Sequence, residues 1–424
     1  MTAHIGVGML GMGTVGSAIA ARLLSEWQLL GERSGAVPVL RHVAVRDVQR
    51  QRDVTLPETV RLGDDPFAVV DDPAVRVVVE VMGGLQPATE CIERALSEGK
   101  HVVTANKAVI ATHGPRLARL AAAHGAGLWF EASAGAGLPI IALLRDSLLG
   151  DRITSLDAVI NTTTNVILTH MRRDGVRLAD ALVDAQRRGF AEADPSSDVD
   201  GWDAAYKLVV MSWLAFGVHV PPEDVDRQGI GDVKLDDIGY AGRLDCSVRL
   251  LAHAARSDAG VVLSVQPTLV AQSHPLYDID DSDNAVLIRS DFASSVLVRG
   301  RGGGGAPTAS AVVSDVVRAA RGDIPVYPAT DGPARLAGEE NDEICGYVRM
   351  MLADVDDARG LVLQAFEDRG VPVEDSRDAP SPQHGAQLVV LTGAAPRAVH
   401  SRALETVETL AAVRGIAASL DRVC

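Results

Sequence analysis

The sequence has few cysteines, few aromatic residues and no long apolar run. Its 424 residues include four Cys, and none of these forms a CxxC pair. We therefore expect no disulfide framework, which fits a reducing cytoplasm. No segment reaches the roughly 18–20 consecutive apolar residues that a membrane span needs. The apolar stretch 1–16 lacks a basic leading region, so it is typical of a strand and a glycine-rich loop rather than of a signal peptide.

Positive charge is also scarce. The chain carries 40 Lys and Arg against 56 Asp and Glu, a formal net charge of −16. This balance argues against electrostatic binding to nucleic acid or to an anionic membrane. A phosphorylated small molecule remains compatible, because a few local donors outweigh the global charge. Hydrophobic residues make up 47%, which predicts a globular protein, and the length indicates two or three domains at about 150 residues each.

The first 130 residues alternate β-rich runs with helical runs. Strands are expected at 4–9, 37–45, 75–81, 101–104 and 127–131, and helices at 14–30, 87–98 and 115–124. This alternation predicts right-handed βαβ units and a parallel sheet. The predicted fold class is therefore α/β, and the glycine motif described below makes 1–132 a predicted Rossmann-type dinucleotide-binding domain.

The pattern changes after this domain. Residues 133–322 mix helices with strands and are predicted to form an α+β domain, to which the family resemblance described below assigns catalysis and dimerisation. Residues 323–344 are a Pro- and Gly-rich linker. Residues 345–424 then give the order βαββαβ, which is typical of a ferredoxin-like domain. A helix at about 307–320 is expected to return to the first domain.

A glycine motif, Gly11-Met-Gly13-Thr14-Val15-Gly16, follows the first expected strand and opens the first expected helix. Gly11 permits the tight turn, Gly13 lets backbone approach a pyrophosphate, and Gly16 allows close packing of helix on sheet. Unpaired N–H groups at the helix start then face the phosphates. The alternative is an ordinary glycine-rich turn, but the strand-loop-helix context favours a dinucleotide site that includes Thr14 and Val15.

The end of the second strand bears on the choice between NAD and NADP. It reads Ala44-Val45-Arg46-Asp47, where an acidic residue would bind a ribose 2′-hydroxyl and an arginine a 2′-phosphate. Because Arg46 comes first, NADP is favoured and NAD remains possible. The alternative is that Arg46 is only a solvated charge at a strand end.

Two lysines stand in unusual places. Lys107 follows an expected buried strand, at the edge where ligands of parallel sheets bind. Lys207 lies on a nearly all-apolar helix, one turn after Asp203. This spacing predicts an Asp203–Lys207 ion pair. The pair is either a weak one on the surface or a buried one with a functional role, and the apolar character of the helix favours the buried pair. The acidic stretch 192–201 just upstream suits an ammonium group or a metal, although such loops are usually solvated.

The sequence resembles homoserine dehydrogenase over about 320 residues, in order, spacing and content. The matching segments are GMGTVG (11–16), EVMGG (80–84), GKHVVTANK (99–107), EASAGAGLPI (131–140), NTTTN (161–165), GFAEADPSSDVDGWDAAYKL (189–208) and GRGGGGAPTASAVVSD (300–315). The C-terminal part resembles the ACT regulatory domain that many bacterial members carry. The resemblance implies reversible hydride transfer between NAD(P)H and aspartate 4-semialdehyde, giving homoserine, in a homodimer or homotetramer of threonine and methionine biosynthesis.

The resemblance also implies residue roles. Lys207 and Lys107 would form the proton-transfer and carbonyl-polarising pair, with Asp203 positioning the substrate or Lys207. The amino-acid end of the substrate would meet Thr162, Thr163, Phe190, Glu192 and Asp198. The cofactor would meet Gly83, Thr104, Lys107 and Gly302 besides the glycine motif and Arg46. Glu131 with Ala134, Ala136 and Leu138 would bind Na⁺ or K⁺, or the glycine-rich segment is simply a hinge.

Three departures from the family pattern stand out. Thr162 replaces the glycine of NGTTN, and Phe190 replaces the tyrosine of GYxEADP, so a shifted substrate is an alternative to homoserine. In the C-terminal domain, Asp357-Ala-Arg-Gly lacks the proline of the usual ACT loop, which puts threonine feedback in doubt.

Two other functions are compatible with these residues. One is a paralogous dehydrogenase for a related amino-acid semialdehyde or hydroxyamino acid, and the other is a non-catalytic NADP or amino-acid sensor. Retention of Lys107, Asp203 and Lys207 argues against the sensor. An aspartate-semialdehyde dehydrogenase would need a nucleophilic cysteine, and no Cys has a suitable setting.

Overall fold

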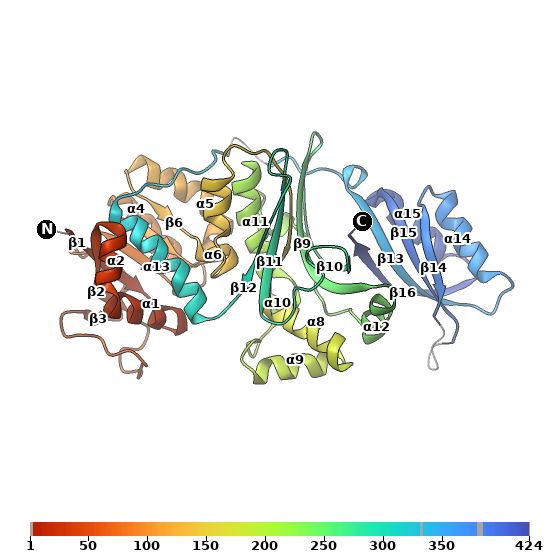
Figure 1. Ribbon diagram of the computed structural model, residues 1–424, viewed down its shortest axis with the longest axis horizontal. Helices are drawn as coiled ribbons and strands as arrows, with labels where there is room; N and C mark the ends of the chain where they lie inside the picture. Colours follow the sequence, from red (N-terminus) through yellow and green to blue (C-terminus); the bar gives the residue numbers. More distant parts are fainter. Residues whose placement is uncertain (1–2, 331–333, 380–384, 424) are drawn as a thin grey trace.

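The computed structural model describes residues 3–330, 334–379 and 385–423. Figure 1 shows a helix-covered sheet at the N-terminal end, a mixed sheet in the middle and a smaller α/β module at the C-terminal end. No helix among the described residues has the length and apolar character to cross a bilayer.

The N-terminal sheet has six parallel strands in the order β3-β2-β1-β4-β5-β6. Its strands are β1 (Ala3–Leu10), β2 (Ala36–Ala44), β3 (Arg61–Gly63), β4 (Val77–Glu80), β5 (His101–Thr104) and β6 (Leu128–Trp129). The valine run of β4 is fully buried because helices cover both faces of such a sheet. The order is that of a doubly wound dinucleotide fold, which confirms the predicted fold class.

Helices of this part are α1 (Thr14–Ser25), α2 (Trp27–Ser34), α3 (Pro66–Asp71), α4 (Ala88–Ser97) and α5 (Lys107–Ala123). The single helix expected at 14–30 is wrong, because Glu26 leaves the helical region (φ −119°, ψ 21°) and divides it into α1 and α2. A helix from much later in the chain, α13 (Gly305–Arg321), packs against α1 and the same sheet. In Figure 1 it lies among the N-terminal helices.

The middle part builds a mixed sheet and the helices on it. Its strands are β7 (Ile153–Val159), β8 (Asp226–Arg227), β9 (Cys246–Ser257), β10 (Gly260–Ala271), β11 (Asp283–Ser290) and β12 (Ser295–Arg301). Its helices are α6 (Ala132–Gly135), α7 (Ile140–Ala142), the π-helix η1 (Leu143–Ser147), α8 (Thr162–Asp174), α9 (Leu178–Arg187), α10 (Ser196–Val199), α11 (Trp202–Phe216), the 3₁₀ turn η2 (Pro222–Asp224) and α12 (Leu235–Arg243). The apolar α11 is buried between this sheet and α5.

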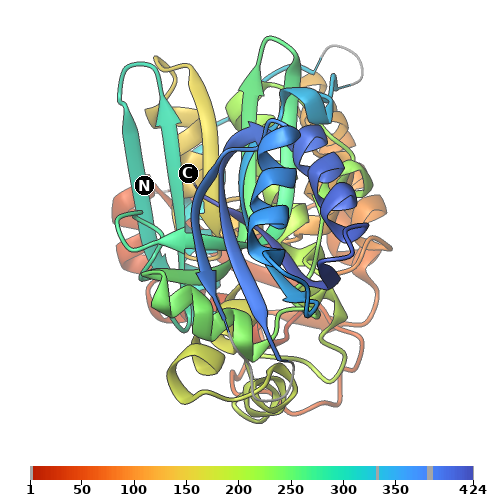
Figure 2. The same ribbon diagram turned by 90° about the vertical axis from the view of Figure 1, so that its right-hand side faces the viewer.

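The C-terminal module has the predicted βαββαβ order. Its elements are β13 (Glu343–Leu352), α14 (Ala358–Asp368), β14 (Val373–Asp378), β15 (Gln387–Pro396), α15 (Arg397–Glu408) and β16 (Val413–Arg422), after a 3₁₀ turn η3 (Glu339–Asn341). The strand order β16-β13-β15-β14 is ferredoxin-like. Figure 2 shows both helices on one side of the strands.

The module's sheet is continuous with the middle sheet, which the sequence did not indicate. β16 runs parallel to β10, with Thr268 opposite Asp421 and Leu269 opposite Arg422. The segment that precedes the module along the chain is also fixed by contacts. Its Tyr327 stacks on Phe130 and donates a hydrogen bond from its hydroxyl to the Leu128 carbonyl at 2.7 Å. The module is therefore tied to the middle part by backbone pairing and not only by a linker.

The expectation that the chain has no disulfide is wrong for one cysteine. Cys91 and Cys246 are free and buried, but Cys345 is disulfide-bonded.

Candidate active site

The glycine motif forms the turn between β1 and α1. Gly11 has φ +98°, and a Cβ there would lie 2.8 Å from the Val81 carbonyl oxygen. A Cβ on Gly16 would collide with the Gly11 carbonyl, whereas Gly13 has open space where its Cβ would be. The motif therefore leaves a backbone cradle in front of the α1 N-terminus, which fits the pyrophosphate of a dinucleotide.

A second helix N-terminus stands beside the first. A Cβ on Gly305, the first residue of α13, would meet the Thr14 side chain at 2.9 Å. A Cβ on Gly137 would meet Pro307 at 2.9 Å, so the 134–138 loop also packs here. Two N-terminal helix ends thus adjoin at one place, and both favour negative charge.

The loops after β4 and β5 are held by a buried carboxylate. Glu80 is fully buried and accepts hydrogen bonds from the Thr104 hydroxyl (2.6 Å) and from the Met82 (2.8 Å) and Gly83 (3.3 Å) amides. Burial raises the pKa of Glu80 despite these donors. Thr104, expected to contact cofactor, is itself buried and uses its hydroxyl here, so the structure gives it a supporting position.

Arg46 is exposed just beyond the end of β2. The strand order puts β2 next to β1, so this end lies on the same edge of the sheet as the glycine motif. That is where a dinucleotide's ribose lies in this fold class.

Lys107, Asp203 and Lys207 meet in one cluster. Lys107 starts α5, Asp203 and Lys207 lie one turn apart on α11, and these two helices pack together. Lys207 Nζ donates to Asp203 Oδ2 at 2.7 Å and to the Ile160 carbonyl at 2.9 Å, and Lys107 Nζ pairs with Asp203 Oδ1. The predicted Asp203–Lys207 pair is thus present and buried, with Lys107 added to it.

Burial and neighbouring charges shift the pKa values of the two lysines in opposite directions. The Lys207 side chain is 13% exposed, and burial together with neighbouring Lys107 lowers its pKa, although Asp203 opposes this. The Lys107 side chain is 38% exposed, and its contact with Asp203 raises its pKa. Burial acts to raise the pKa of Asp203, but the two ammonium groups hold it well below its usual range. The cluster therefore carries a net positive charge in a pocket.

A cavity of about 330 Å³ opens beside this cluster. Its lining comes from the start of α8, the loop before α10, α10 itself, helix α11, the loop before β11 and the glycine loop before α13: Asn161, Thr162, Thr163, Gly189, Phe190, Asp198, Asp203, Lys207, Ser282, Gly302, Gly303 and Gly304. Asp198 accepts from the Asn161 side-chain amide (2.7 Å) and lies 2.8 Å from the Thr163 hydroxyl. Polar groups thus surround a space next to a buried ammonium.

The predicted substrate residues are placed unequally. Thr163, Phe190 and Asp198 line the cavity, and Thr163 Oγ1 also donates to the Phe190 carbonyl at 2.8 Å. Glu192 is exposed and does not line it, although its charge contributes to the raised pKa of Lys107. Thr162 occupies the first turn of α8 and is not among the described residues with positive φ, so the lost glycine is not needed for backbone geometry there.

Gly302 lines the cavity, and its contact with the cofactor stays a prediction. A Cβ there would overlap the Asn284 side chain, so this glycine makes room for Asn284 at the cavity wall. Asn284 is fully buried, donates to the Ile160 carbonyl (3.0 Å) and accepts from Thr162 (3.4 Å). Asn284 was not predicted as a site residue, since nothing in its local sequence pattern sets it apart. Asn161 was not predicted either, and its signal was its position before the helix that begins at Thr162.

The Glu131 segment combines two buried carboxyl groups. Glu131 accepts from the Ile141 (2.8 Å) and Ala142 (2.9 Å) amides, while its own amide donates to Asp315 (2.8 Å). Burial and Asp315 raise the pKa of Glu131 to about 7. The described residues contain no cluster of three or more His, Cys, Asp or Glu side chains suited to a metal. A cation here would depend on carbonyl oxygens of Ala134, Ala136 and Leu138.

Known proteins match the chain over nearly its full length. The family described as "Homoserine dehydrogenase, NAD binding domain" matches residues 11–131, and "Homoserine dehydrogenase" matches residues 139–317. A homoserine dehydrogenase of Synechocystis is 39% identical over 433 residues, covering 97% of both chains. The chain belongs to the homoserine dehydrogenase family. It is an NAD(P)-dependent oxidoreductase that acts on a CH–OH group, which confirms the resemblance seen in the sequence.

Solved structures of the family agree with this. The homoserine dehydrogenase of Thiobacillus denitrificans has a TM-score of 0.93 at 33% identity and covers 99% of this chain and 98% of its own. A hyperthermophilic archaeal homoserine dehydrogenase in complex with NADPH has a TM-score of 0.64 at 31% identity, covering 76% of this chain and 100% of its own. The part that matches the family's NAD binding domain, residues 11–131, includes the glycine cradle.

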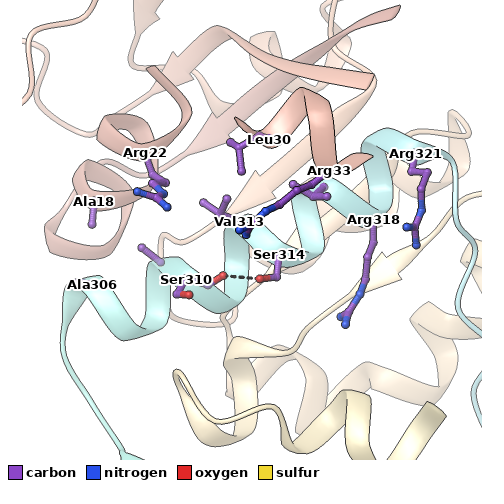
Figure 3. A pocket seen from close by; sticks show the side chains of 12 residues that line it. Ala18, Arg22, Leu30, Arg33, Ala306, Ser310, Val313, Ser314, Arg318 and Arg321 are labelled. Atoms are coloured by element: carbon purple, nitrogen blue, oxygen red, sulfur yellow. Dashed lines mark hydrogen bonds between the residues drawn. The ribbon is translucent and has the colours of Figure 1, made fainter. Parts of the chain in front are cut away.

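A separate hollow lies outside this site. The groove between α1, α2 and α13, of about 520 Å³, is lined by Arg22, Arg33, Arg318 and Arg321 (Figure 3). None of the predicted site residues lines it, and three of its arginines have carboxylate partners, as Arg22 has in Glu26. It is not part of the candidate active site.

Proposed function

We propose that the protein is an NADP-preferring homoserine dehydrogenase in which Lys207 moves the proton. Reduction of aspartate 4-semialdehyde to homoserine adds a hydride to the aldehyde carbon and a proton to its oxygen, and oxidation reverses both. The observation that carries the proposal is Lys207. Two of its three N–H groups are held by Asp203 and Ile160, which leaves the third for a substrate oxygen in the cavity.

The environment of Lys207 suits this role. A free lysine, with a pKa of about 10.4, is a weak acid near neutrality. Burial and Lys107 lower the pKa of Lys207, which brings proton donation closer to neutral pH. The charge that develops on the substrate oxygen meets the Lys207 ammonium directly and the positive field of Lys107 beyond it.

Asp203 positions both lysines. Its two oxygens receive Lys207 and Lys107, and Asn161 donates to Oδ2 at 2.8 Å. These three donors keep the carboxylate ionised, so it fixes the direction of the Lys207 Nζ. The amino-acid end of the substrate then occupies the Thr163, Phe190 and Asp198 side of the cavity, where Asp198 offers negative charge to an ammonium.

The cofactor site rests on the glycine cradle. Bound NADPH supplies the hydride. Gly13, Thr14, Val15 and Gly16 present backbone N–H groups to its pyrophosphate. Gly11, whose own amide donates to the Ala44 carbonyl at 2.9 Å, forms the tight turn before them, and Gly83 lies on the neighbouring strand-end loop. Arg46 binds the 2′-phosphate that distinguishes NADP from NAD.

Arg46→Ala is expected to lower the preference for NADP over NAD, measured as the ratio of kcat/KM values, by about tenfold or more. A charge-assisted contact to phosphate is worth roughly 1.5–3 kcal/mol. Arg50→Ala, an exposed arginine on the same loop, is the matched control and should leave the ratio unchanged. An unchanged ratio in Arg46→Ala would contradict the assignment.

The Glu131 segment binds a monovalent cation in this proposal. A Na⁺ or K⁺ ion held by Glu131 and the carbonyls of Ala134, Ala136 and Leu138 would compensate the negative charge of Glu131, whose pKa is raised by burial and by the nearby Asp315 carboxylate. We expect a melting temperature roughly 2 °C or more higher in KCl or NaCl than in tetramethylammonium chloride of equal ionic strength. Glu131→Gln should remove this difference, and its persistence in the variant would count against the site.

A purified-enzyme assay tests the function as a whole. NADPH absorbance is followed with homoserine, threonine, 4-hydroxythreonine and other γ-hydroxy amino acids in turn. We expect homoserine to have the highest kcat/KM. The second candidate, a dehydrogenase of a related hydroxyamino acid, is favoured by Phe190 and Thr162 in the cavity wall, and turnover of such a compound without turnover of homoserine would establish it instead.

A further inference from the structure

The carbonyl oxygen of Ile160 receives two side-chain donors. Lys207 Nζ donates to it at 2.9 Å, and Asn284 Nδ2 donates to it at 3.0 Å. A backbone carbonyl offers two lone pairs, so both hydrogen bonds form at once. Ile160 directly follows β7 and is fully buried. The amide of Asn284 therefore lies against the same atom that orients the lysine.

Asn284 stands behind the wall of the substrate cavity. It is fully buried on β11 and does not belong to the residues that line the cavity. The sheet places it there, because the register of β11 and β7 pairs Ala285 with Val159 and so brings Asn284 beside the end of β7. An influence of Asn284 on proton transfer would therefore act through Ile160 and Lys207.

The Asn284 side chain has no room to move. A Cβ on Gly302 would overlap it, and the three atoms nearest to that Cβ are the carbon, nitrogen and oxygen of the Asn284 amide. The backbone of Gly302 therefore packs directly on the amide, and a larger residue at 302 does not fit while Asn284 is present. Close packing of this kind holds a buried group in one position.

Thr162 sets which way the amide faces. Its hydroxyl donates to Asn284 Oδ1 at 3.4 Å, while the Ile160 carbonyl offers only an acceptor to the amide nitrogen. A reversed amide would place its oxygen against the Ile160 carbonyl, where neither group can donate. The hydroxyl that favours the observed orientation stands at the position where the motif NGTTN has glycine.

The amide also contributes to the electrostatics around Lys207. Burial and Lys107 lower the pKa of Lys207, whereas Asp203 and Asp198 act to raise it. The positive end of the Asn284 amide lies near the ammonium, because both groups donate to one oxygen. It therefore disfavours the charged form, as Lys107 does. Loss or reversal of the amide would raise the pKa of Lys207.

We propose that Asn284 is a positioning residue for proton transfer by Lys207. Its amide holds the Ile160 carbonyl, and that carbonyl fixes one N–H of the lysine while another is left for the substrate oxygen in the cavity. The Thr162 hydroxyl keeps the amide in the required orientation. This inference rests on the proposed function, since it concerns the group that moves the proton.

A size exchange separates positioning from packing. Asn284→Ala removes the amide and should lower kcat at least about tenfold, with an unchanged Kd for NADPH. It also leaves a cavity and lowers the melting temperature. Adding Gly302→Ala fills that space with the methyl group that Asn284 otherwise excludes. The double variant should regain melting temperature while kcat stays low. Recovery of kcat together with stability would overturn the proposal, since packing alone would then explain the loss.

Variants of Thr162 test the orientation without changing the buried amide, so the test survives if the Asn284 variants fold poorly. Thr162→Val keeps the shape but lacks the hydroxyl, and the midpoint of the kcat–pH profile for homoserine oxidation should rise by about half a pH unit or more. Thr162→Ser keeps the hydroxyl and should retain the wild-type midpoint. Thr169→Val, the same exchange at a buried site two turns along α8, is the matched control. A wild-type profile in Thr162→Val would overturn the proposal.

A double-mutant cycle shows whether Thr162 acts through Asn284 or on the substrate directly. Asn284→Ala with Thr162→Val should be no slower than Asn284→Ala alone, because the hydroxyl then has no amide to orient. Losses in kcat that multiply would show independent action and overturn the coupling of the two residues.

The wild-type enzyme is the reference for the proposed function. If it does not turn over homoserine, the proposed function fails, and the variants are assayed with the hydroxyamino acid that the enzyme accepts. If it turns over homoserine and both Asn284→Ala and Thr162→Val keep its kcat and pH midpoint, the positioning role alone fails.

Discussion

Lys207→Ala is expected to lower kcat by about 10²–10⁴-fold, the range typical of a lost general acid or base, with little change in NADPH affinity. The Lys207 amine is the buried cation with an N–H left over for the substrate, since its other two are held by Asp203 and Ile160. Without it, the developing alkoxide has no adjacent proton donor. Stopped-flow absorbance gives kcat, and fluorescence titration gives the Kd for NADPH.

The matched control lies on the same helix. Ser212 is buried on α11 and donates to the Val209 carbonyl at 3.0 Å, away from the cavity. Ser212→Ala should keep kcat within about twofold, so a large loss in Lys207→Ala alone cannot come from general disturbance of α11. Wild-type kcat in Lys207→Ala would show that another group moves the proton.

Asp203→Asn is expected to have the second large effect, on activity and on stability. The substitution keeps the shape but removes the only carboxylate on which both lysines converge in the described structure. Leaving buried charge uncompensated costs about 3–5 kcal/mol, and the loss of Nζ orientation should lower kcat at least about 100-fold. Urea unfolding monitored by tryptophan fluorescence measures the first quantity.

The pH dependence of this stability effect has a defined sign. The two ammonium groups hold the pKa of Asp203 below its unfolded value despite burial, which is about 3.9. Its contribution is therefore fully present above about pH 5 and is lost as the pH falls toward the folded-state pKa. The difference in unfolding free energy between wild type and Asp203→Asn should be constant at pH 6–8 and shrink below about pH 4. A difference that grows on acidification would contradict the assigned pairing.

The parts that could be predicted from sequence are those with local causes. The glycine motif between an apolar strand and an amphipathic helix predicted the turn between β1 and α1, and the spacing of Asp203 and Lys207 predicted their pair. Valine runs indicated buried parallel strands. The family resemblance brought Lys107 into the same pocket, which spacing alone did not indicate, because α5 and α11 are almost 100 residues apart in sequence.

What could not be predicted depends on contacts between distant segments. Asn284 fits beside Gly302 only because β11 and the loop after β12 adjoin there. The union of the module's sheet with the middle sheet rests on two residue pairs between β10 and β16. The Thr104 hydroxyl was expected to be available to the cofactor, but it donates a hydrogen bond to the buried Glu80 carboxylate. The function of the module as an ACT regulatory domain stays a prediction.

The central claim, that Lys207 moves the proton, is tested most directly by the pH dependence of kcat for homoserine oxidation. Oxidation needs a neutral amine to accept the proton, so kcat should rise with pH to a plateau, with a midpoint below the value of about 10.4 for a free lysine, because burial lowers the pKa of Lys207. Lys207→Arg keeps a positive charge that does not titrate in this range, and its residual activity should lack the rise. The same rise at the same pH in Lys207→Arg would contradict the account.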